Sequence, residues 1–403
     1  MPVLYFDNFR GFDKTFLPLM NVNFFVGENS TGKTSVLKLI RILSEPRFWF
    51  TMDFNSEEAE LGYYSEIASL SSPNKRFFDI AILGDFRDKD EGISAIKLRF
   101  HNKDGVAAIK EISIIRKDIN LQAVFEKTVV KYRHSKIDLQ SINEANKLKY
   151  FKRWVSTNEL ENKSFKKFET NISFGGQPYY FILHEILIQI KQVQSSDSKI
   201  SLSLPNFLHD VAWLAPIRTD PKRTYDSYKI AFNPDGTHAP YLLKKLLSKE
   251  TSNKTREKIQ GILKKFGSDS GLFEDIVIKN LGKTDTSPFE LHILINGKPL
   301  KITNVGYGVS QILPLIVEVI ARGNDSWFAI QQPEIHLHPK AQAAFGDFIF
   351  KSVLNDKKSF VIETHSDYTI DRFRLKLNKY SKNNTGGSIK SQIVFFMTIF
   401  NLS

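Results

Sequence analysis

Residues 27–34 constrain the fold of this chain more than any other segment does. They read Gly27-Glu28-Asn29-Ser30-Thr31-Gly32-Lys33-Thr34 and follow an apolar run at residues 22–26. Glycines in such a loop let backbone N–H groups converge on phosphate oxygens, and the N-terminus of a following helix adds its dipole. Residues 36–43 are apolar at helical spacing, so the strand, the loop and the helix are all present. This context favours a phosphate-binding loop over an ordinary turn rich in Gly and Ser.

The loop predicts a nucleoside triphosphate and a magnesium ion as its ligands. We expect the Lys33 ammonium to reach the β- and γ-phosphates, where it would offset their negative charge. We expect the Thr34 hydroxyl to ligate Mg²⁺.

Composition narrows the class of protein. The chain has 403 residues, 41% of them hydrophobic, which is enough to bury a large core in one elaborated domain or two. It contains no cysteine, so disulfides, thiolate zinc sites and cysteine nucleophiles are excluded. Residues 1–7 lack the pattern of a signal peptide, and the most apolar stretch, residues 312–321, is too short to span a membrane and carries Glu318. We therefore expect a cytoplasmic protein with no membrane partner.

The charge is unevenly distributed. The net charge is +12 and the pI is near 9.4, which favours polyanionic partners. Residues 127–168 hold eleven Lys and Arg against four Asp and Glu, with aromatic residues between them. Cations can follow a phosphate backbone and rings can stack on bases, which makes DNA contacts candidates for Lys152, Arg153, Lys166 and Lys167. The opposing interpretation is a solvated insertion whose aromatic residues pack inward, and the sequence leaves both open.

The hydrophobic pattern divides the chain into three parts. Residues 1–119 are predicted to contain short strands, residues 120–204 are polar and basic with a helix at 179–193, and residues 205–403 alternate helix and buried strand after residue 304. Within these parts, strands are predicted at 3–9, 15–19, 77–118 (several), 211–214, 275–278 and 291–295, and a helical stretch at 241–265.

Three later segments carry further candidate site residues. Residues 304–311 place glycines just before an apolar helix, which predicts a second anion site. The buried strand at 327–330 ends in the polar segment 331–339, and the buried strand at 360–362 ends in Glu363-Thr364-His365-Ser366. Ligands bind at the ends of such strands in an open α/β sheet, so the His365 ring could donate a hydrogen bond to a γ-phosphate.

Taken together, these motifs resemble the ABC-type ATPases of the RecF/SMC-like branch. The resemblance is strongest to the ATPase domains of the overcoming-lysogenization-defect (OLD) nucleases and to the Septu-type antiphage ATPases, and it covers about residues 1–50 and 210–375. It implies an α/β fold: an ABC-type P-loop head with an N-terminal antiparallel β subdomain and an inserted, largely helical basic region. The matching segments are 9–11, 27–34, 305–311, 332–339 and 363–366, together with 213–218, 234–236 and Pro240.

The resemblance implies a composite ATP site with Mg²⁺. Residues 27–35, ending at Ser35, would hold the phosphates, and the turn with Gly306, Gly308 and Ser310 would close on the ATP of a partner subunit. ATP would then join two copies into a homodimer or a larger even-numbered oligomer. By the same resemblance, further positions of the site are the metal position Gln331, the catalytic positions Gln332, Glu334 and His365, the subunit-contacting His338, and residues 8–10 near the adenine.

Gln331 departs from the family pattern, because an acidic residue is expected at the magnesium position. Gln332 follows it, and an amide cannot accept a proton near neutral pH. Either Glu334 supplies the charge, or hydrolysis is slow, or an engineered Glu→Gln change traps ATP. Two further interpretations stay open: a metal site formed by Glu334, His336 and His338, and ion pairs rather than phosphate or DNA contacts for Arg218 and Arg223.

The expected function is that of an ABC-type ATPase that binds Mg·ATP, dimerises on ATP and binds or senses DNA. It would control a separate effector in antiphage defence. OLD-like nucleases continue into a nuclease (TOPRIM) domain, but fewer than 40 residues follow His365. The chain is therefore either truncated or dependent on a separate effector protein such as a nuclease. Two rival hypotheses are a RecF-like DNA-repair ATPase and a nucleotide-gated scaffold that binds ATP but hydrolyses little of it.

Overall fold

The structure is a computed structural model that divides into two compact units. The first unit comprises residues 1–20, 38–210 and 399–403, and the second comprises 21–37 and 211–398. The residues that the structure describes are 2–56, 58–69, 76–84, 93–116, 118–126, 129–138, 142, 146–157, 160–168, 179–192, 208, 211–216, 218–226, 231–284, 287–383 and 389–396.

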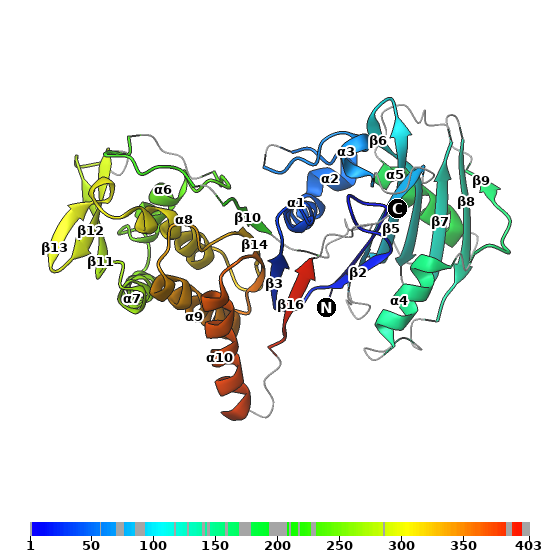
Figure 1. Cartoon of the computed structure of the whole chain (residues 1–403). Coiled ribbons are helices and arrows are strands. Elements are labelled where there is room, and N and C mark those ends of the chain that lie inside the picture. Colours follow the sequence, from blue (N-terminus) through cyan, green and yellow to red (C-terminus); the bar gives the residue numbers. More distant parts are fainter. Residues whose placement is uncertain are drawn as a thin grey trace. The chain divides into compact units, whose positions relative to one another are not determined.

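The first unit contains an eight-stranded antiparallel sheet (Figure 1). Its strand order is β2-β1-β4-β5-β6-β7-β8-β9. Asp104 and Gly105 join β5 to β6 with positive φ angles of 54° and 86°, as a tight hairpin turn requires. The strands are β1 (Val3–Asp7), β2 (Thr15–Pro18), β4 (Phe77–Leu83), β5 (Ile93–Lys103), β6 (Val106–Arg116), β7 (Ile119–Phe125), β8 (Val130–Lys136) and β9 (Lys166–Lys167).

Both faces of this sheet are covered by apolar side chains. Helix α4 (Lys147–Ser156) buries Phe151 and Trp154 against one face. On the sheet, the rings of Phe78 and Phe100 stack with centroids 4.9 Å apart, and Phe54 packs edge-on against both. The other helices of the unit are α2 (Pro46–Thr51), α3 (Tyr64–Ile67) and α5 (Tyr179–Gln192).

Among its described residues, the basic region 120–204 contains strands as well as helices. It contains α4 and α5, but β7 and β8 extend the sheet of the preceding strands, and much of the remainder lies outside the described residues. Five of the seven β7 residues are buried, although apolar and polar residues alternate at 119–123. Its buried polar side chains are satisfied, since Asn120 accepts from Trp154 Nε1 and Gln122 accepts from Arg133 Nε. The sheet therefore continues across the predicted boundary at residue 119.

The second unit is built on a five-stranded parallel sheet with the order β10-β14-β15-β3-β16. Its strands are short apolar runs, as expected where helices cover both faces. They are β3 (Val22–Gly27), β10 (Ala212–Leu214), β14 (Trp327–Gln331), β15 (Ser359–Glu363) and β16 (Ser391–Phe396). The sequence also predicts an apolar strand at residues 393–400, of which residues 397–400 lie outside the described residues.

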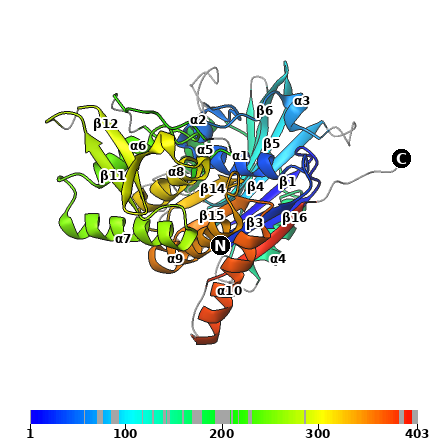
Figure 2. The same ribbon diagram turned by 60° about the vertical axis from the view of Figure 1, so that its left-hand side comes forward.

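Helices and a small second sheet complete this unit. Figure 2 shows α9 and α10 together beside β15 and β3. The ring of Phe373 on α10 contacts Phe350 on α9 and Phe24 on β3, with centroids 5.9 and 5.5 Å away. The elements are α6 (Ala239–Leu246), α7 (Asn253–Ser270), η2 (Ile302–Asn304), α8 (Tyr307–Ala321), α9 (Pro339–Asp356) and α10 (Asp367–Asn383), with the antiparallel strands β11 (Asp275–Asn280), β12 (Phe289–Ile295) and β13 (Lys298–Lys301).

The observed elements confirm the predicted α/β class with an N-terminal antiparallel β subdomain. Helix α1 (Lys33–Ser44) follows β3 directly, and its first residues cluster with the second unit. The functional division into residues 1–119, 120–204 and 205–403 stays a prediction. Within the described part of the chain, no helix combines the length and the apolar character needed to cross a membrane.

Candidate functional site

The loop after β3 has the backbone geometry of an anion cradle. Gly27 has a φ of 136°, and a Cβ there would lie 2.1 Å from the Phe396 carbonyl oxygen on β16, so only glycine fits where the chain leaves the strand. Ser30 and Gly32 also have positive φ angles, 64° and 93°. Helix α1 begins at Lys33, and the N–H groups of a first helical turn have no partner within the helix. The residues present therefore fit a phosphate chain.

The Lys33 side chain is folded into this loop. It is only 3% exposed, and its ammonium donates to the carbonyl oxygens of Gly27 at 2.9 Å and Glu28 at 2.5 Å. Among the described residues, it forms no ion pair with a carboxylate. The Thr31 hydroxyl oxygen lies 3.5 Å from the same ammonium. A buried cation held only by neutral carbonyl and hydroxyl groups gains from an anionic ligand.

Thr34 connects the loop to the ends of two strands. Its hydroxyl donates to Glu363 Oε2 at 2.9 Å and accepts from Gln331 Nε2 at 2.9 Å. Gln331 and Glu363 face each other in the parallel register of β14 and β15. Burial raises the pKa of the Glu363 carboxyl, while the Thr34 hydroxyl and the Lys33 ammonium act against that shift.

Of these groups, Thr34 and Gln331 were predicted to share the metal position, and the structure brings them together. Glu363 was not among the predicted site residues. The available signal was its place directly after the buried strand at 360–362, at the sheet edge where ligands bind.

The predicted catalytic residues Gln332, Glu334 and His365 gather at the end of β15. Glu334 accepts from the Thr364 hydroxyl and from the His365 backbone N–H, both at 2.7 Å, so each carboxylate oxygen already has a donor. Gln332 has a φ of 44° and donates its backbone N–H to the Glu363 carbonyl oxygen at 2.8 Å. The His365 side chain is exposed at this edge. Their catalytic roles stay predictions.

Arg218 places a buried guanidinium beside the carboxyl end of β14. It is 2% exposed, and its Nη2 donates to the Gln331 carbonyl oxygen at 3.3 Å. Nε and Nη1 have no hydrogen-bond partner in the described part of the chain. Burial lowers the pKa of the guanidinium to about 10, and the charge of Glu334 opposes that shift. The burial argues against DNA contact, and no ion pair joins Arg218 to a described residue, whereas Arg223 is exposed.

The turn before α8 is held firmly by its surroundings. Gly306 is the N-cap of the helix, and a Cβ at Gly308 would lie 2.8 Å from the His336 carbonyl oxygen. The Tyr307 ring meets the His336 ring edge-on at 4.8 Å. Ser310 is 5% exposed and donates its hydroxyl inward to the Tyr307 carbonyl oxygen at 2.7 Å. The exposed part of this turn therefore offers backbone donors rather than the Ser310 hydroxyl.

The metal site considered at Glu334, His336 and His338 has no support in the structure. Among the described residues, no group of three or more His, Cys, Asp and Glu side chains is arranged to hold a metal ion. His338 instead caps α9, where its Nδ1 accepts from the Ala341 N–H at 3.4 Å.

The remaining predicted site residues lie in the first unit. Lys152 and Arg153 on α4 and Lys166 and Lys167 on β9 are all exposed. Of the aromatic residues beside them, Phe151, Trp154 and Phe168 are buried and pack inward, whereas Phe165 is 41% exposed, with the Arg133 guanidinium 4.4 Å from its ring centroid. DNA binding by the four cations stays a prediction. The same holds for residues 8–10 near the adenine.

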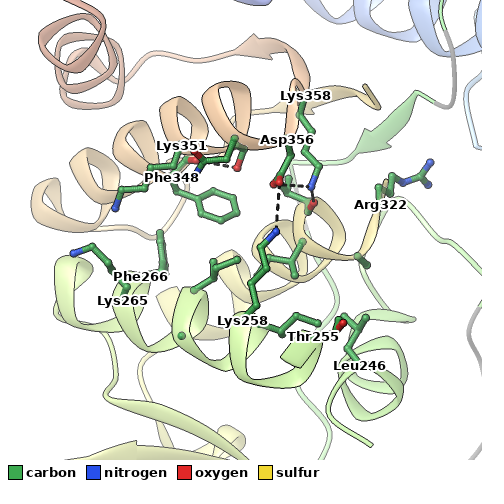
Figure 3. Close-up of a pocket in the computed structure, with 18 of the residues that line it drawn as sticks. Leu246, Thr255, Lys258, Lys265, Phe266, Arg322, Phe348, Lys351, Asp356 and Lys358 are labelled. Atoms are coloured by element: carbon green, nitrogen blue, oxygen red, sulfur yellow. Dashed lines mark hydrogen bonds and ion pairs between the residues drawn. The ribbon is translucent and has the colours of Figure 1, made fainter. Parts of the chain in front are cut away.

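A separate cavity of about 500 Å³ lies between α7, α8 and α9 (Figure 3). Its charged side chains are paired with one another: Lys258 and Lys358 both reach Asp356, at 3.6 and 3.5 Å. None of the residues that line it belongs to the phosphate-binding loop or to the strand ends described above.

Comparison with known proteins gives a family match and a set of similar structures. Residues 4–370 match the family described as AAA ATPase domain. No curated protein matches the sequence. Similar solved structures include an SMC head bound to the C-winged helix domain of ScpA (12% identity, 92% of this chain and 90% of that one, TM-score 0.41). Another is the SMC head domain from Thermotoga maritima (9% identity, 92% and 90%, TM-score 0.36). A third is an Smc head with a coiled coil and joint from Pyrococcus yayanosii (11% identity, 92% and 94%, TM-score 0.40).

Proposed function

The chain belongs to the AAA ATPase domain family, and we propose that it is an ABC-type ATPase that binds Mg·ATP at residues 27–35. ATP and Mg²⁺ are the cofactors that a family of ATPases implies. The observation that carries the proposal is the contact of Thr34, the first hydroxyl of α1, with both strand ends, Gln331 and Glu363. This places a hydroxyl, an amide and a carboxylate beside a phosphate cradle.

The residues of the site would divide the work of binding. The backbone of residues 27–32 would hold the phosphate oxygens, and Lys33 would exchange its carbonyl partners for phosphate. The unused donors of Arg218 would offer two further hydrogen bonds to an anion at this edge. Bound Mg²⁺ would neutralise phosphate charge next to Thr34.

We further propose that ATP joins two copies of the chain. Gly306 and Tyr307 are exposed, and the first turn of α8 presents N–H donors that its own helix does not use. The close packing of Gly308 on the 336–337 segment would keep this turn rigid. Such a turn would complete the nucleotide site of a partner copy and so link association to ATP.

One observation favours a second candidate function, a nucleotide-gated scaffold with slow hydrolysis. The side chains of Gln331 and Gln332 cannot take a proton, and both oxygens of Glu334 are held by Thr364 and His365. Steady-state ATP turnover with and without duplex DNA separates the two. Turnover at background while ATP stays bound would support the scaffold.

The wider role is proposed from the sequence motifs and from the charge. Antiphage defence and control of a separate effector such as a nuclease rest on the OLD- and Septu-like motifs. DNA binding rests on the basic surplus, with Lys152, Arg153, Lys166 and Lys167 as exposed cations. The RecF-like repair role would use the same ATP chemistry.

Lys33→Ala is the direct test of the nucleotide site. Loss of the buried ammonium should weaken ATP binding about ten- to a hundredfold, as expected when a charge-assisted contact to phosphate is lost. The readouts are ATP affinity by calorimetry and molar mass by light scattering with Mg·ATP. Lys38→Ala, later in the same helix, is the matched control and should bind and dimerise normally. Equal affinity in Lys33→Ala and the wild type would refute the site, and a monomeric wild type with ATP bound would refute the dimer.

A further inference from the structure

The metal position has an amide where a carboxylate is needed, and a carboxylate stands one strand away. Mg²⁺ prefers hard oxygen ligands and is usually held in phosphate sites by one or two carboxylates together with the substrate phosphates. Gln331 cannot supply that negative charge. Resting on the proposed function, we infer that Glu363 supplies the carboxylate of the magnesium site and that Gln331 has become a positioning residue for Thr34.

The contact with Thr34 is the first step of the argument. Glu363 Oε2 lies 2.9 Å from the Thr34 hydroxyl, the oxygen expected to ligate the metal. In the described part of the chain, no other carboxylate hydrogen-bonds to that hydroxyl. A cation bound to Thr34 would therefore lie beside the Glu363 carboxylate.

The register of the sheet shows how the metal-binding carboxylate could be supplied by either of two neighbouring strands. Gln331 and Glu363 are directly paired at the ends of β14 and β15. Neighbouring strands lie about 4.8 Å apart, and both side chains already meet at the Thr34 oxygen. Moving a carboxylate from one position to the other therefore keeps it within reach of the same metal.

Glu334, the other candidate, is committed elsewhere. Its two oxygens accept from the Thr364 hydroxyl and the His365 N–H, both at 2.7 Å. These bonds tie the loop after β14 to the residues that follow Glu363. Glu334 therefore helps to hold the end of β15, whereas Glu363 faces the hydroxyl.

The buried position of Glu363 points the same way. The residue is 4% exposed. Among the described residues, its carboxylate accepts one hydrogen bond, from the Thr34 hydroxyl. One hydroxyl and the nearby charge of Lys33 compensate this buried carboxylate only in part. A divalent cation at this place would provide it.

The test measures metal binding rather than turnover. Mn²⁺ serves as the probe, detected by electron paramagnetic resonance with a non-hydrolysable ATP analogue bound, and the affinity for the analogue without metal is measured separately. Glu363→Gln should weaken Mn²⁺ binding by about ten- to a hundredfold, the range seen when groups around a metal are changed. Its metal-free affinity for the analogue should stay close to that of the wild type.

Two further variants make the test specific. The double variant Gln331→Glu with Glu363→Gln moves the carboxylate from β15 to the paired position on β14. This exchange should restore most of the Mn²⁺ affinity. Glu334→Gln tests the rival assignment and should cost clearly less Mn²⁺ affinity than Glu363→Gln, because it disturbs only the packing of the β15 end. The exchange keeps the net charge at this edge, so it stays informative if Glu363→Gln alone folds poorly, which thermal unfolding would reveal.

Two results would overturn the inference alone, and a third would overturn it together with the proposed function. If Glu363→Gln binds the analogue and also Mn²⁺ like the wild type, the carboxylate lies elsewhere while the nucleotide site stands. If Glu334→Gln loses the metal and the exchange variant restores nothing, Glu334 supplies the charge. A wild-type protein that binds no analogue at all would refute the proposed function and this inference together.

Discussion

Two clusters of buried charge, one in each unit, show opposite ways of placing ions inside a protein. In the first unit, Asp79 is bound by both Nε and Nη2 of Arg99 at 2.8 Å and by Lys97 at 3.2 Å. In the second unit, Lys33 has carbonyl partners, Glu363 has one hydroxyl, and Arg218 leaves two donors unused among the described residues.

The difference separates a structural cluster from a binding site. The Asp79 cluster compensates its own desolvation and holds β4 to β5. The second cluster leaves buried charge undercompensated, which costs folding free energy that a ligand of opposite charge can offset on binding. Buried charge that lacks full compensation, at the carboxyl ends of the strands, therefore indicates a binding site. A cluster whose charges are all paired, like that of Asp79, gives no such indication.

Removing the Asp79 charge should have the largest effect on stability. Asp79→Asn leaves Arg99 and Lys97 without their shared anion, although Arg99 is 35% exposed and Lys97 keeps its bond to the Val155 carbonyl oxygen. We expect the first unit to lose about 1–3 kcal/mol of unfolding free energy. Urea unfolding measures this loss, and ATP affinity in the folded protein should not change. Asp104→Asn in the exposed β5–β6 turn is the control, since Asn also accepts positive φ, and should be nearly neutral. A loss below about 1 kcal/mol would remove the contrast between the two clusters.

Arg218→Met should act in the opposite sense. Replacing the buried guanidinium with an apolar side chain removes its desolvation cost, so the ligand-free protein should be as stable as the wild type or more so. Loss of hydrogen bonds to a charged ligand, worth about 1.5–3 kcal/mol, should weaken ATP binding roughly ten- to a hundredfold. Thermal unfolding and calorimetry measure the two effects, with Arg223→Met as the exposed control. Destabilisation like that of Asp79→Asn, with ATP affinity intact, would make Arg218 structural.

Acid should reveal the smallest difference between the wild type and the Asp79→Asn variant. Burial raises the pKa of Asp79, but the bonds from Arg99 and Lys97 outweigh it and hold that pKa below its ordinary 3.8. The stability from this carboxylate is therefore present above pH 3.8 and is lost as the pH falls through the lowered value in the folded protein. Urea unfolding from pH 6 downward measures the difference in unfolding free energy between the wild type and Asp79→Asn. This difference should become smaller only below pH 3.8. Narrowing that begins near neutral pH would contradict the assignment.

Much of the architecture could be predicted because it depends on local pattern. The strands at 22–26, 327–330 and 360–362 are short apolar runs, and the structure confirms them as β3, β14 and β15. The extension of the sheet by β7 was missed although residues 119–123 alternate apolar and polar, because this short signal stands at the start of a polar, basic stretch. The inward packing of Phe151 and Trp154 was one of two open interpretations, since a ring beside lysines looks the same whether it faces the core or a base.

By itself, the sequence determined that a phosphate-binding loop lies between a strand and a helix. The spacing of Gly27, Gly32, Lys33 and Thr34 is a local property that only a few backbone conformations satisfy. Only the tertiary structure decided which carboxylate meets Thr34 and that Arg218 is buried with unused donors. Those facts depend on the order β10-β14-β15-β3, which brings together residues hundreds of positions apart. The local pattern carries no information about which strands become neighbours, because pairing is settled by the packing of the whole sheet.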